Sequence, residues 1–291
     1  MGRWLGRCQL RLRALGLLAP TLRRAGATRL IALTHGHEAG WAMLPGARQL
    51  LRRIGDTVDV VTYLGEYFRT RLARAMSPQA AARMVRLAPG VDVATFRDAR
   101  PAELPAGGPT VLCVSRLVPR KGQDTLIRAW PAVRAAIPDA RLLLVGDGPY
   151  RGELNRLAGE LRVAGSVTFA GSVRADDLPG YYAASDVFAM PCRTRRSGLD
   201  VEGLGIVYLE ASAAGLPVIG GDSGGAPDAI LDGETGYVVP GRGVAALAER
   251  IIALLADPAR ARTMGRRGQA WAEQEWDWSR VAGRLNALLE G

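Results

Sequence analysis

Residues 110–122 read TVLCVSRLVPRKG, and this stretch decides the fold that the sequence predicts. It opens with a nearly continuous apolar run, which is typical of a strand buried on both faces of a parallel sheet. The loop that follows carries Arg116 and Lys121, and a stretch with helical spacing begins at the lysine. A strand, a loop and a helix in this order form the repeating unit of an α/β domain.

The same unit recurs along the chain after this stretch. Short apolar runs alternate with longer segments of helical periodicity, which favours a doubly wound sheet covered by helices on both faces. The predicted strands are residues 110–115, 141–145, 166–170, 186–190 and 217–220. The predicted helices are residues 121–137, 150–163, 175–185 and 205–214, followed by 243–256, 258–274 and 278–289.

The N-terminal third predicts a second α/β domain of the same kind. Leucines recur near helical spacing up to about residue 25, and Gly26 follows as a stop signal, so we expect a helix there. Strands are expected at residues 29–34, 58–63 and 84–87, and helices at 47–54 and 66–76 lie between them.

A segment rich in proline separates the two parts. Residues 98–109 contain three prolines and two glycines without periodicity, which is typical of a linker between domains. We therefore predict an N-terminal Rossmann-like domain over residues 1–103 and a C-terminal Rossmann-like domain over 104–275. A last helix over 276–291 is expected to pack back on the N-terminal domain.

The formal charge of +10 belongs to the first third of the chain. Residues 1–108 hold 17 arginines against 7 acidic residues, and the remaining residues hold 21 of each sign. This excess suggests a polyanionic partner, either nucleic acid or the anionic face of a membrane, and a merely solvated basic surface is the alternative. Nucleic acid is disfavoured because no basic stripe is interleaved with aromatic residues and no known module occurs.

Cysteine use and hydropathy indicate the compartment. Cys8, Cys113 and Cys192 lie far apart and form no Cys-x-x-Cys pair, which is typical of a reduced protein. Arginines interrupt the apolar residues near the N-terminus, so no signal peptide is expected, and no later run approaches the roughly 18 apolar residues of a membrane span. We expect a cytoplasmic protein that is peripheral on the inner face of the plasma membrane.

Candidate sites lie in the loops after strands, because ligands of open α/β sheets bind beyond the carboxyl ends of the strands. In the first such loop, Arg116 and Lys121 lie beside a helix N-terminus, where free N–H groups and the helix dipole add to their charge. This arrangement favours a diphosphate, and an exposed basic turn is the alternative. Lys121 is the only lysine of the chain, so a compact cation stands where arginine is otherwise used.

A second loop carries two carboxylates. Residues 192–211 read CRTRRSGLDVEGLGIVYLEA, with Glu202 just before the predicted helix and Glu210 within it. Carboxylates accept hydrogen bonds from neighbouring hydroxyls of a sugar, and the glycines after Glu202 expose N–H groups. A solvated helix that carries two acids by chance is the alternative, but this helix is otherwise apolar. A third loop, Gly146-Asp147-Gly148, is compatible with a ligand or with a simple tight turn.

Arg116 and Lys121, followed by Glu202 and Glu210 with seven residues between them, resemble the donor-site signature of the family-4 retaining glycosyltransferases. The resemblance covers the C-terminal two thirds of the chain. Residues 114–130 and 190–212 are more similar still to the actinobacterial GDP-mannose-dependent phosphatidylinositol mannoside mannosyltransferases. The resemblance implies the α/β fold called GT-B, built from two Rossmann-like doubly wound domains.

The resemblance also implies a role for each matching residue. Arg116 and Lys121 would hold the diphosphate and stabilise the leaving nucleotide, Glu202 would hold the mannose, and Glu210 would bind the ribose. His35 matches a histidine of the N-terminal domain that reaches the donor sugar, and a turn histidine with satisfied hydrogen bonds is the alternative. The catalytic set is thus Arg116, Lys121, His35 and Glu202. Backbone contacts to the sugar and the base are implied at Gly203, Leu204, Gly205, Ile206, Val207, Gly171 and Val173.

The implied enzyme is a hexosyltransferase that moves mannose from GDP-mannose to a phosphatidylinositol mannoside with retention of configuration. A diphosphate oxygen would take the acceptor proton, so no side-chain acid or base of the glycosidase type is expected. The implied partners are a nucleotide-sugar donor, a glycolipid acceptor and an anionic membrane surface. No cofactor is implied, metal dependence stays open, and the pair His35 and His37 is weak evidence for a metal site.

The sequence also departs from the family's pattern. A GT-B enzyme opens its N-terminal domain with a strand and a glycine-rich loop, and only about 100 residues precede the linker here. We therefore expect a shortened N-terminal domain, either because the start codon is assigned too late or because the product is truncated. If Met1 is the genuine start, we expect low solubility or weak activity. Two alternatives stay open: a transferase with another nucleotide sugar or a soluble acceptor, and a non-catalytic nucleotide-sugar-binding remnant.

Overall fold

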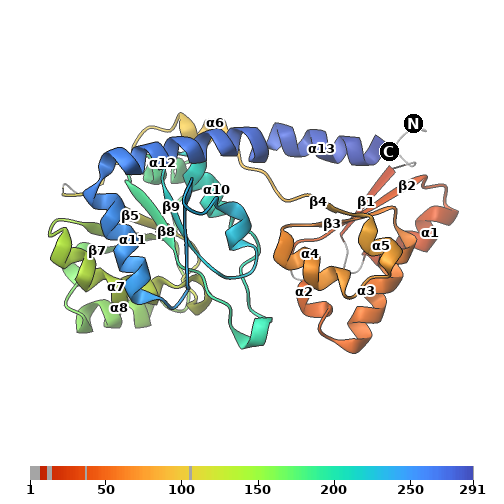
Figure 1. Cartoon of the computed structure of the whole chain (residues 1–291), viewed down its shortest axis with the longest axis horizontal. Coiled ribbons are helices and arrows are strands. Elements are labelled where there is room, and N and C mark those ends of the chain that lie inside the picture. Colours follow the sequence, from red (N-terminus) through yellow and green to blue (C-terminus); the bar gives the residue numbers. More distant parts are fainter. Residues whose placement is uncertain (1–6, 12–14, 37, 105–106, 291) are drawn as a thin grey trace. The chain divides into compact units, whose positions relative to one another are not determined.

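The computed structural model describes residues 7–11, 15–36, 38–104 and 107–290 (Figure 1). The chain divides into two compact units, one formed by residues 1–90 with 278–291 and the other by residues 91–277. Each unit contains one parallel sheet flanked by helices. The predicted α/β class is therefore confirmed.

The second unit contains a six-stranded sheet in the order β10-β9-β8-β5-β6-β7, and every neighbouring pair is parallel. The central strands β5 and β8 are buried along their whole length, as their nearly continuous apolar sequences require. The strands are β5 (Thr110–Val114), β6 (Arg141–Val145), β7 (Val167–Gly171), β8 (Val187–Met190), β9 (Val218–Gly221) and β10 (Gly236–Val239).

Helices form two layers around this sheet (Figure 1). In one layer, α7 (Gln123–Ala136) packs against α8 (Arg151–Glu160) and α11 (Val244–Ala256). The other layer contains α6 (Val93–Arg97), α9 (Leu178–Ala183), α10 (Ile206–Ala213) and α12 (Pro258–Trp271). Short 3-10 turns lie at Pro119–Lys121, Ala164–Ser166, Arg196–Gly198 and Ala226–Ala229, and a π turn lies at Ala272–Trp276.

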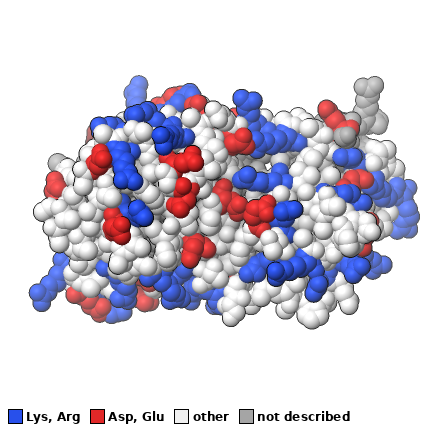
Figure 2. Space-filling model, in the orientation of Figure 1, with Lys and Arg blue, Asp and Glu red and all other residues white. Residues whose placement is uncertain are grey.

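The first unit contains a four-stranded parallel sheet in the order β1-β2-β3-β4. Its core joins Leu30 and Val61 of the sheet to Leu51, Ile54 and Leu72 of the helices. The strands are β1 (Arg7–Arg11), β2 (Arg29–Leu33), β3 (Val60–Tyr63) and β4 (Met84–Arg86). The helices are α1 (Ala19–Arg24), α2 (Glu38–Trp41), α3 (Pro45–Thr57), α4 (Glu66–Ala73), α5 (Pro78–Ala82) and α13 (Trp278–Glu290), with a 3-10 turn at Leu15–Leu18. Arginine side chains gather over the part of this unit that carries α1, α3 and α4 (Figure 2).

The helix expected up to residue 25 is wrong for residues 7–11, which form β1. Every residue of this strand pairs with β2, from Arg7 opposite Arg29 to Arg11 opposite Leu33. Residues 1–6 and 12–14 of the expected helix lie outside the described residues, and the first α-helix that the structure describes begins at Ala19. A leucine pattern describes local preference alone, and pairing with a distant strand overrides it. Strand β10 is absent from the predicted strands, although β8 and β9, which are equally short, are among them.

Residues 91–103 pack on the second unit, although the predicted domain boundary lies at residue 103. The ring of Phe96 contacts Tyr182 edge to face, with 5.4 Å between centroids. The backbone N–H of Ala102 donates to the carbonyl of Gly180 at 2.9 Å. At the other end of the chain, Nε of Arg29 donates to the carbonyl of Leu288 at 2.9 Å within the first unit.

Candidate active site

The second unit reverses its strand order at one place. β6 and β7 follow β5 on one side, whereas β8, β9 and β10 lie on the other, so β5 and β8 are neighbours. In open α/β sheets, ligands bind beyond the carboxyl ends of the strands at such a switch point. Loops 115–122 and 191–205 follow these two strands, and the N–H of Arg193 joins them by donating to the carbonyl of Arg120 at 2.9 Å. The topology thus brings together the two loops that the sequence singled out.

The loop after β5 is held in one conformation by backbone and by a buried side chain. Gly122 has φ +77°, and a Cβ atom built there would lie 2.0 Å from the carbonyl oxygen of Pro191. Nε2 of Gln123, which is fully buried, donates to Oγ of Ser115 at 2.8 Å and to the carbonyl of Arg116 at 2.9 Å. Only glycine combines this dihedral angle with so close an approach of two loops.

Arg116 and Lys121 lie on this loop in different surroundings. Arg116 is exposed, and its guanidinium makes no hydrogen bond or ion pair with any residue that the structure describes. Lys121 ends a 3-10 turn two residues before α7, and its side chain is only 13% exposed. One cation is therefore free for a ligand, and the other is already engaged within the protein.

Lys121 pairs with Glu202, which the sequence places 81 residues further along the chain. Nζ of Lys121 lies 2.8 Å from Oε2 of Glu202, and Nη1 of Arg120 lies 2.5 Å from the same oxygen. Nε of Arg120 also lies 3.0 Å from Oδ1 of Asp200. Glu202 is buried, and a buried carboxylate is tolerated only when it is paired.

Arg120 is a site residue that the sequence reasoning missed. It stands next to Lys121 in the same basic loop, and that adjacency was the available signal. The sequence alone cannot tell which of two neighbouring cations faces a carboxylate, because the choice depends on how the loop turns.

The backbone around Glu202 is also fixed. Its N–H donates to Oγ of the buried Ser223 at 3.2 Å, and its carbonyl accepts from Gly225 at 3.2 Å. Upstream, Arg196 and Ser197 adopt left-handed φ angles of 50° and 51°. Such angles cost energy for residues other than glycine and concentrate where a loop has a function.

The loops after β6 and β7 join the same end of the sheet. Gly146 has φ +120°, and a Cβ atom there would lie 2.1 Å from the carbonyl oxygen of Ser115. Its N–H donates to the carbonyl of Gly171 at 2.7 Å, and the carbonyl of Asp147 accepts from the N–H of Leu117 at 3.0 Å. Gly171 therefore lies beside the loop of Arg116, and Val173 follows it, partly buried.

Helix α10 begins at Ile206, directly after the predicted glycine-containing segment. Its N-cap is Gly205, with φ +77°, and the first N–H groups of any helix have no partner within it. A Cβ atom at Gly203 would meet no atom within 4 Å, so space is open there. The structure places the remaining members of this predicted set, Leu204 and Val207, in the same segment as a buried and a partly buried residue.

The side chain of Glu210 contacts a buried tyrosine of this unit. The hydroxyl of Tyr182, which is fully buried, donates to Oε2 of Glu210 at 2.7 Å. Burial raises the pKa of Glu210, and the hydrogen bond from Tyr182 opposes this shift. A carboxylate held in this way keeps one oxygen for another hydroxyl.

His35 belongs to the first unit, whereas the other predicted site residues belong to the second. It follows β2, its side chain is exposed, and its N–H donates to Oε2 of the buried Glu38 at 3.0 Å. The next residue, Gly36, adopts φ +89°, and its backbone packs against the ring of Phe68. His37 lies outside the described residues.

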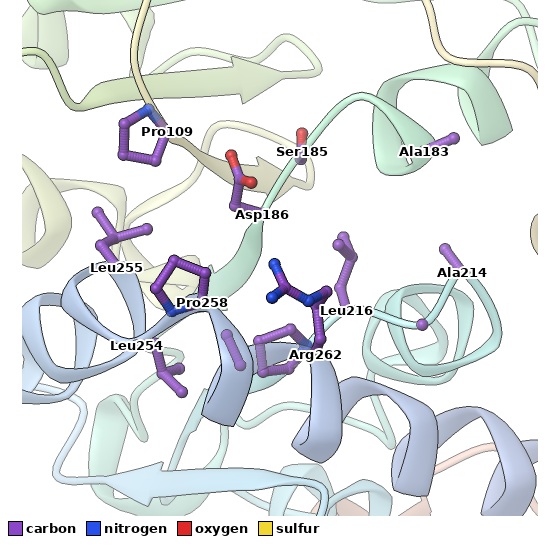
Figure 3. Close-up of a pocket in the computed structure, with 13 residues that line it drawn as sticks. Pro109, Ala183, Ser185, Asp186, Ala214, Leu216, Leu254, Leu255, Pro258 and Arg262 are labelled. Carbon is purple, nitrogen blue, oxygen red and sulfur yellow. The ribbon is translucent and has the colours of Figure 1, made fainter.

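A separate cavity of about 280 Å³ lies at the opposite end of the strands of the second unit (Figure 3). Pro109, Asp186 and Pro217, which precede β5, β8 and β9, line it together with Arg262 of α12. Asp186 is partly engaged, since its Oδ2 accepts from the N–H of Thr110 at 2.7 Å. The cavity contains none of the predicted site residues.

The described side chains include neither a reactive cysteine thiolate nor a cluster of metal ligands. Burial raises the pKa of Cys113 to about 12 and that of Cys192 to about 11, so neither is a thiolate nucleophile at neutral pH. Among the described residues, no three His, Cys, Asp or Glu side chains gather as metal ligands. No helix in the described part of the chain is long and apolar enough to cross a membrane.

Known proteins are similar to this chain over most of its length. Residues 95–271 match the family described as "Glycosyl transferases group 1". The chain is 54% identical over 284 residues to the GDP-mannose-dependent alpha-(1-6)-phosphatidylinositol monomannoside mannosyltransferase of Mycolicibacterium smegmatis, covering 95% of this chain and 74% of the relative. It is 49% identical over 285 residues to the corresponding enzyme for the monoacylated lipid from Corynebacterium glutamicum, with coverage of 95% and 74%.

Solved structures share the fold. Sucrose-phosphate synthase from Thermosynechococcus elongatus superposes with a TM-score of 0.75 at 29% identity, covering 94% of this chain and 70% of that one. The Anabaena protein HepE, in complex with UDP and glucose, gives a TM-score of 0.77 at 23% identity, with coverage of 95% and 74%. The GT-B prediction is confirmed.

Proposed function

Since the chain belongs to the group 1 glycosyl transferases, we propose that it transfers mannose from GDP-mannose to a phosphatidylinositol monomannoside, forming an α-(1-6) linkage. The observation that carries this proposal is 54% identity, over 95% of the chain, to an enzyme of that name. The site fits such a donor, because cations, free helix N–H groups and paired carboxylates meet at one end of the sheet.

The proposal assigns a role to each group. Arg116 and Lys121 bind the diphosphate and stabilise the negative charge that develops on the leaving nucleotide. Glu202 and the backbone of residues 203–207 hold the mannose, and Glu210 holds the ribose through the oxygen that Tyr182 leaves free. Gly171 and Val173 contact the base, and His35 reaches the donor sugar.

The reaction needs no side-chain base under this proposal. The hydroxyl of the acceptor attacks the anomeric carbon on the face from which the diphosphate leaves, so configuration is retained. A diphosphate oxygen takes the proton of that hydroxyl, while the bond between the sugar and the diphosphate breaks.

The direct test measures transfer of radiolabelled sugar to lipid. GDP-mannose and UDP-glucose are each offered with phosphatidylinositol and with its monomannoside. We expect label in a dimannoside only from GDP-mannose with the monomannoside. Label from UDP-glucose would identify a transferase with another donor, and tight binding of GDP-mannose without turnover would identify a non-catalytic binding protein.

Glu210→Gln provides a second test, because it should weaken donor binding without destabilising the fold. Removing the ionised oxygen should weaken binding of GDP about 10-fold, the loss expected for a hydrogen bond to a charged group, measured by calorimetry. Because burial raises its pKa, Glu210 binds its proton more tightly in the folded state, and ionised Glu210 disfavours folding.

The stability of this variant follows from the same shift. The unfolding free energy of the natural protein should fall as pH rises from the ordinary glutamate value through the raised one, and that of Glu210→Gln should not. The variant should therefore melt above the natural protein at pH 8, and the gap should close as pH falls toward 4. If Glu210→Gln melted below the natural protein at pH 8, the raised pKa of Glu210 would be contradicted.

We also propose that the first unit binds the anionic inner face of the plasma membrane, where the lipid acceptor lies. Leu44, just before α3, is 56% exposed, and Leu50 of α3 is 38% exposed; Arg52 and Arg53 of the same helix are also exposed. Exposed apolar side chains flanked by arginines are typical of helices that lie at a membrane surface.

The double variant Arg52→Gln/Arg53→Gln should bind vesicles of anionic lipid about 10-fold or more weakly, since each such charge contributes ~1 kcal/mol. Sedimentation with vesicles at two salt concentrations measures this loss. Arg128→Gln/Arg262→Gln, which removes two exposed arginines of the second unit, is the matched control and should bind as the natural protein does. Equal loss in both variants would indicate attraction by net charge alone.

A further inference from the structure

Two cations share one oxygen of Glu202 in this site. Nη1 of Arg120 and Nζ of Lys121 both contact Oε2, at 2.5 Å and 2.8 Å. The side chain of Glu202 is 7% exposed, and that of Lys121 is 13% exposed. The lysine that the proposed function assigns to the diphosphate is thus bound to the carboxylate that it assigns to the sugar.

These two assignments require Lys121 to leave Glu202 when the donor enters. A lysine ammonium is a compact cation on a flexible stem and can turn from one anion to another. If Lys121 were the sole partner of Glu202, its departure would leave a buried carboxylate without a counter-charge, which is strongly unfavourable. Something else must therefore neutralise Glu202 during the exchange.

Arg120 has the geometry for that task. Its Nε contacts Oδ1 of Asp200 at 3.0 Å while Nη1 contacts Glu202, so two carboxylates fix its guanidinium. Its carbonyl is held by the N–H of Arg193. A planar guanidinium held at both ends stays in place when a neighbouring ion pair breaks.

We infer that Arg120 is a positioning residue that remains on Glu202 as its permanent counter-charge and thereby releases Lys121 to the diphosphate of the donor. This inference rests on the proposed function, because it needs Lys121 to bind the diphosphate. Arg120 itself touches neither the diphosphate nor the reacting atoms. Both cations occupy Oε2, so Oε1 is left for a sugar hydroxyl.

Binding of GDP, which lacks the sugar, tests the exchange by calorimetry. In Arg120→Gln, Lys121 is the only cation left on Glu202, so GDP should bind about 10-fold or more weakly. In Arg120→Gln/Glu202→Gln no carboxylate retains the lysine, and affinity should recover to within about 3-fold of the natural protein. Arg195→Gln is the matched control, because Arg195 contacts Asp200 at 3.5 Å but not Glu202, and it should bind GDP normally.

A purely structural role for Arg120 predicts the opposite pattern, since a second substitution would not restore binding. The inference is therefore wrong if the double variant binds GDP as weakly as Arg120→Gln, or if Arg120→Gln binds it normally. Should Arg120→Gln not fold, Glu202→Gln alone decides, because freeing Lys121 should tighten GDP binding about 3-fold or more, and unchanged affinity would refute the exchange.

Lys121→Gln separates this inference from the proposed function. If that variant binds GDP as the natural protein does, Lys121 does not hold the diphosphate, and both fail. If it binds GDP weakly while Arg120→Gln binds it normally, the inference fails and the proposed function stands.

Discussion

Replacing Arg116 or Lys121 by alanine should reduce the rate of mannose transfer at least about 10²-fold, the loss that follows removal of one group that stabilises charge in a transition state. Departure of the nucleotide places negative charge on the diphosphate, and Arg120, the third cation of the loop after β5, is fixed by Asp200 and Glu202. Arg116 is exposed and makes no ion pair in the described part of the protein. Lys121 is the only lysine of the chain.

The kinetic form of this loss identifies its origin. Both kcat and kcat/KM should fall, since the interaction strengthens as the bond to the diphosphate breaks. The melting temperature of Arg116→Ala should stay within about 1–2 °C of the natural value, because an exposed side chain without partners contributes little to stability.

Arg128→Ala is the matched control for this pair. Arg128 is an exposed arginine of α7, the helix that follows the same loop, and its removal should leave transfer unchanged. Survival of activity in both Arg116→Ala and Lys121→Ala would remove the proposed stabilisation of the leaving group.

Gly122→Ala should have the second largest effect, and it should act on the fold and the site together. The alanine Cβ would lie 2.0 Å from the carbonyl oxygen of Pro191, and φ of +77° is itself strained for alanine. Strain of this kind costs roughly 1–3 kcal/mol, so the melting temperature should fall by several degrees. Relief requires the loops after β5 and β8 to separate, which moves the proposed diphosphate-binding residues away from the proposed sugar-binding segment and should abolish most donor binding.

Gly159→Ala is the natural comparison for this variant. It lies within α8, where an added Cβ would meet no atom within 4 Å, and it should raise stability by up to about 1 kcal/mol through the better helix propensity of alanine. Thermal melts and titration with GDP-mannose on both variants check the pair. A Gly122→Ala protein with normal melting and normal donor affinity would show that the two loops do not need this contact.

Periodicity predicted the second unit well because its strands are short, apolar and separated by helices. β5 and β8 are buried along their whole length, so their apolar runs have no other explanation. The same reasoning failed at residues 7–11, where the strand is specified by β2 and not by its own residues. It also missed β10, a four-residue strand paired along the edge of the sheet with β9.

The sequence by itself determined which residue types the site would use, namely cations after one strand and carboxylates after another. Only the tertiary structure decided that Lys121 and Arg120 share Oε2 of Glu202, and that Tyr182 holds Glu210. The physical reason is that an ion pair depends on the distance and burial of two side chains. Both are set by the order of strands in the sheet and by the glycine angles of the loops, which local patterns do not specify.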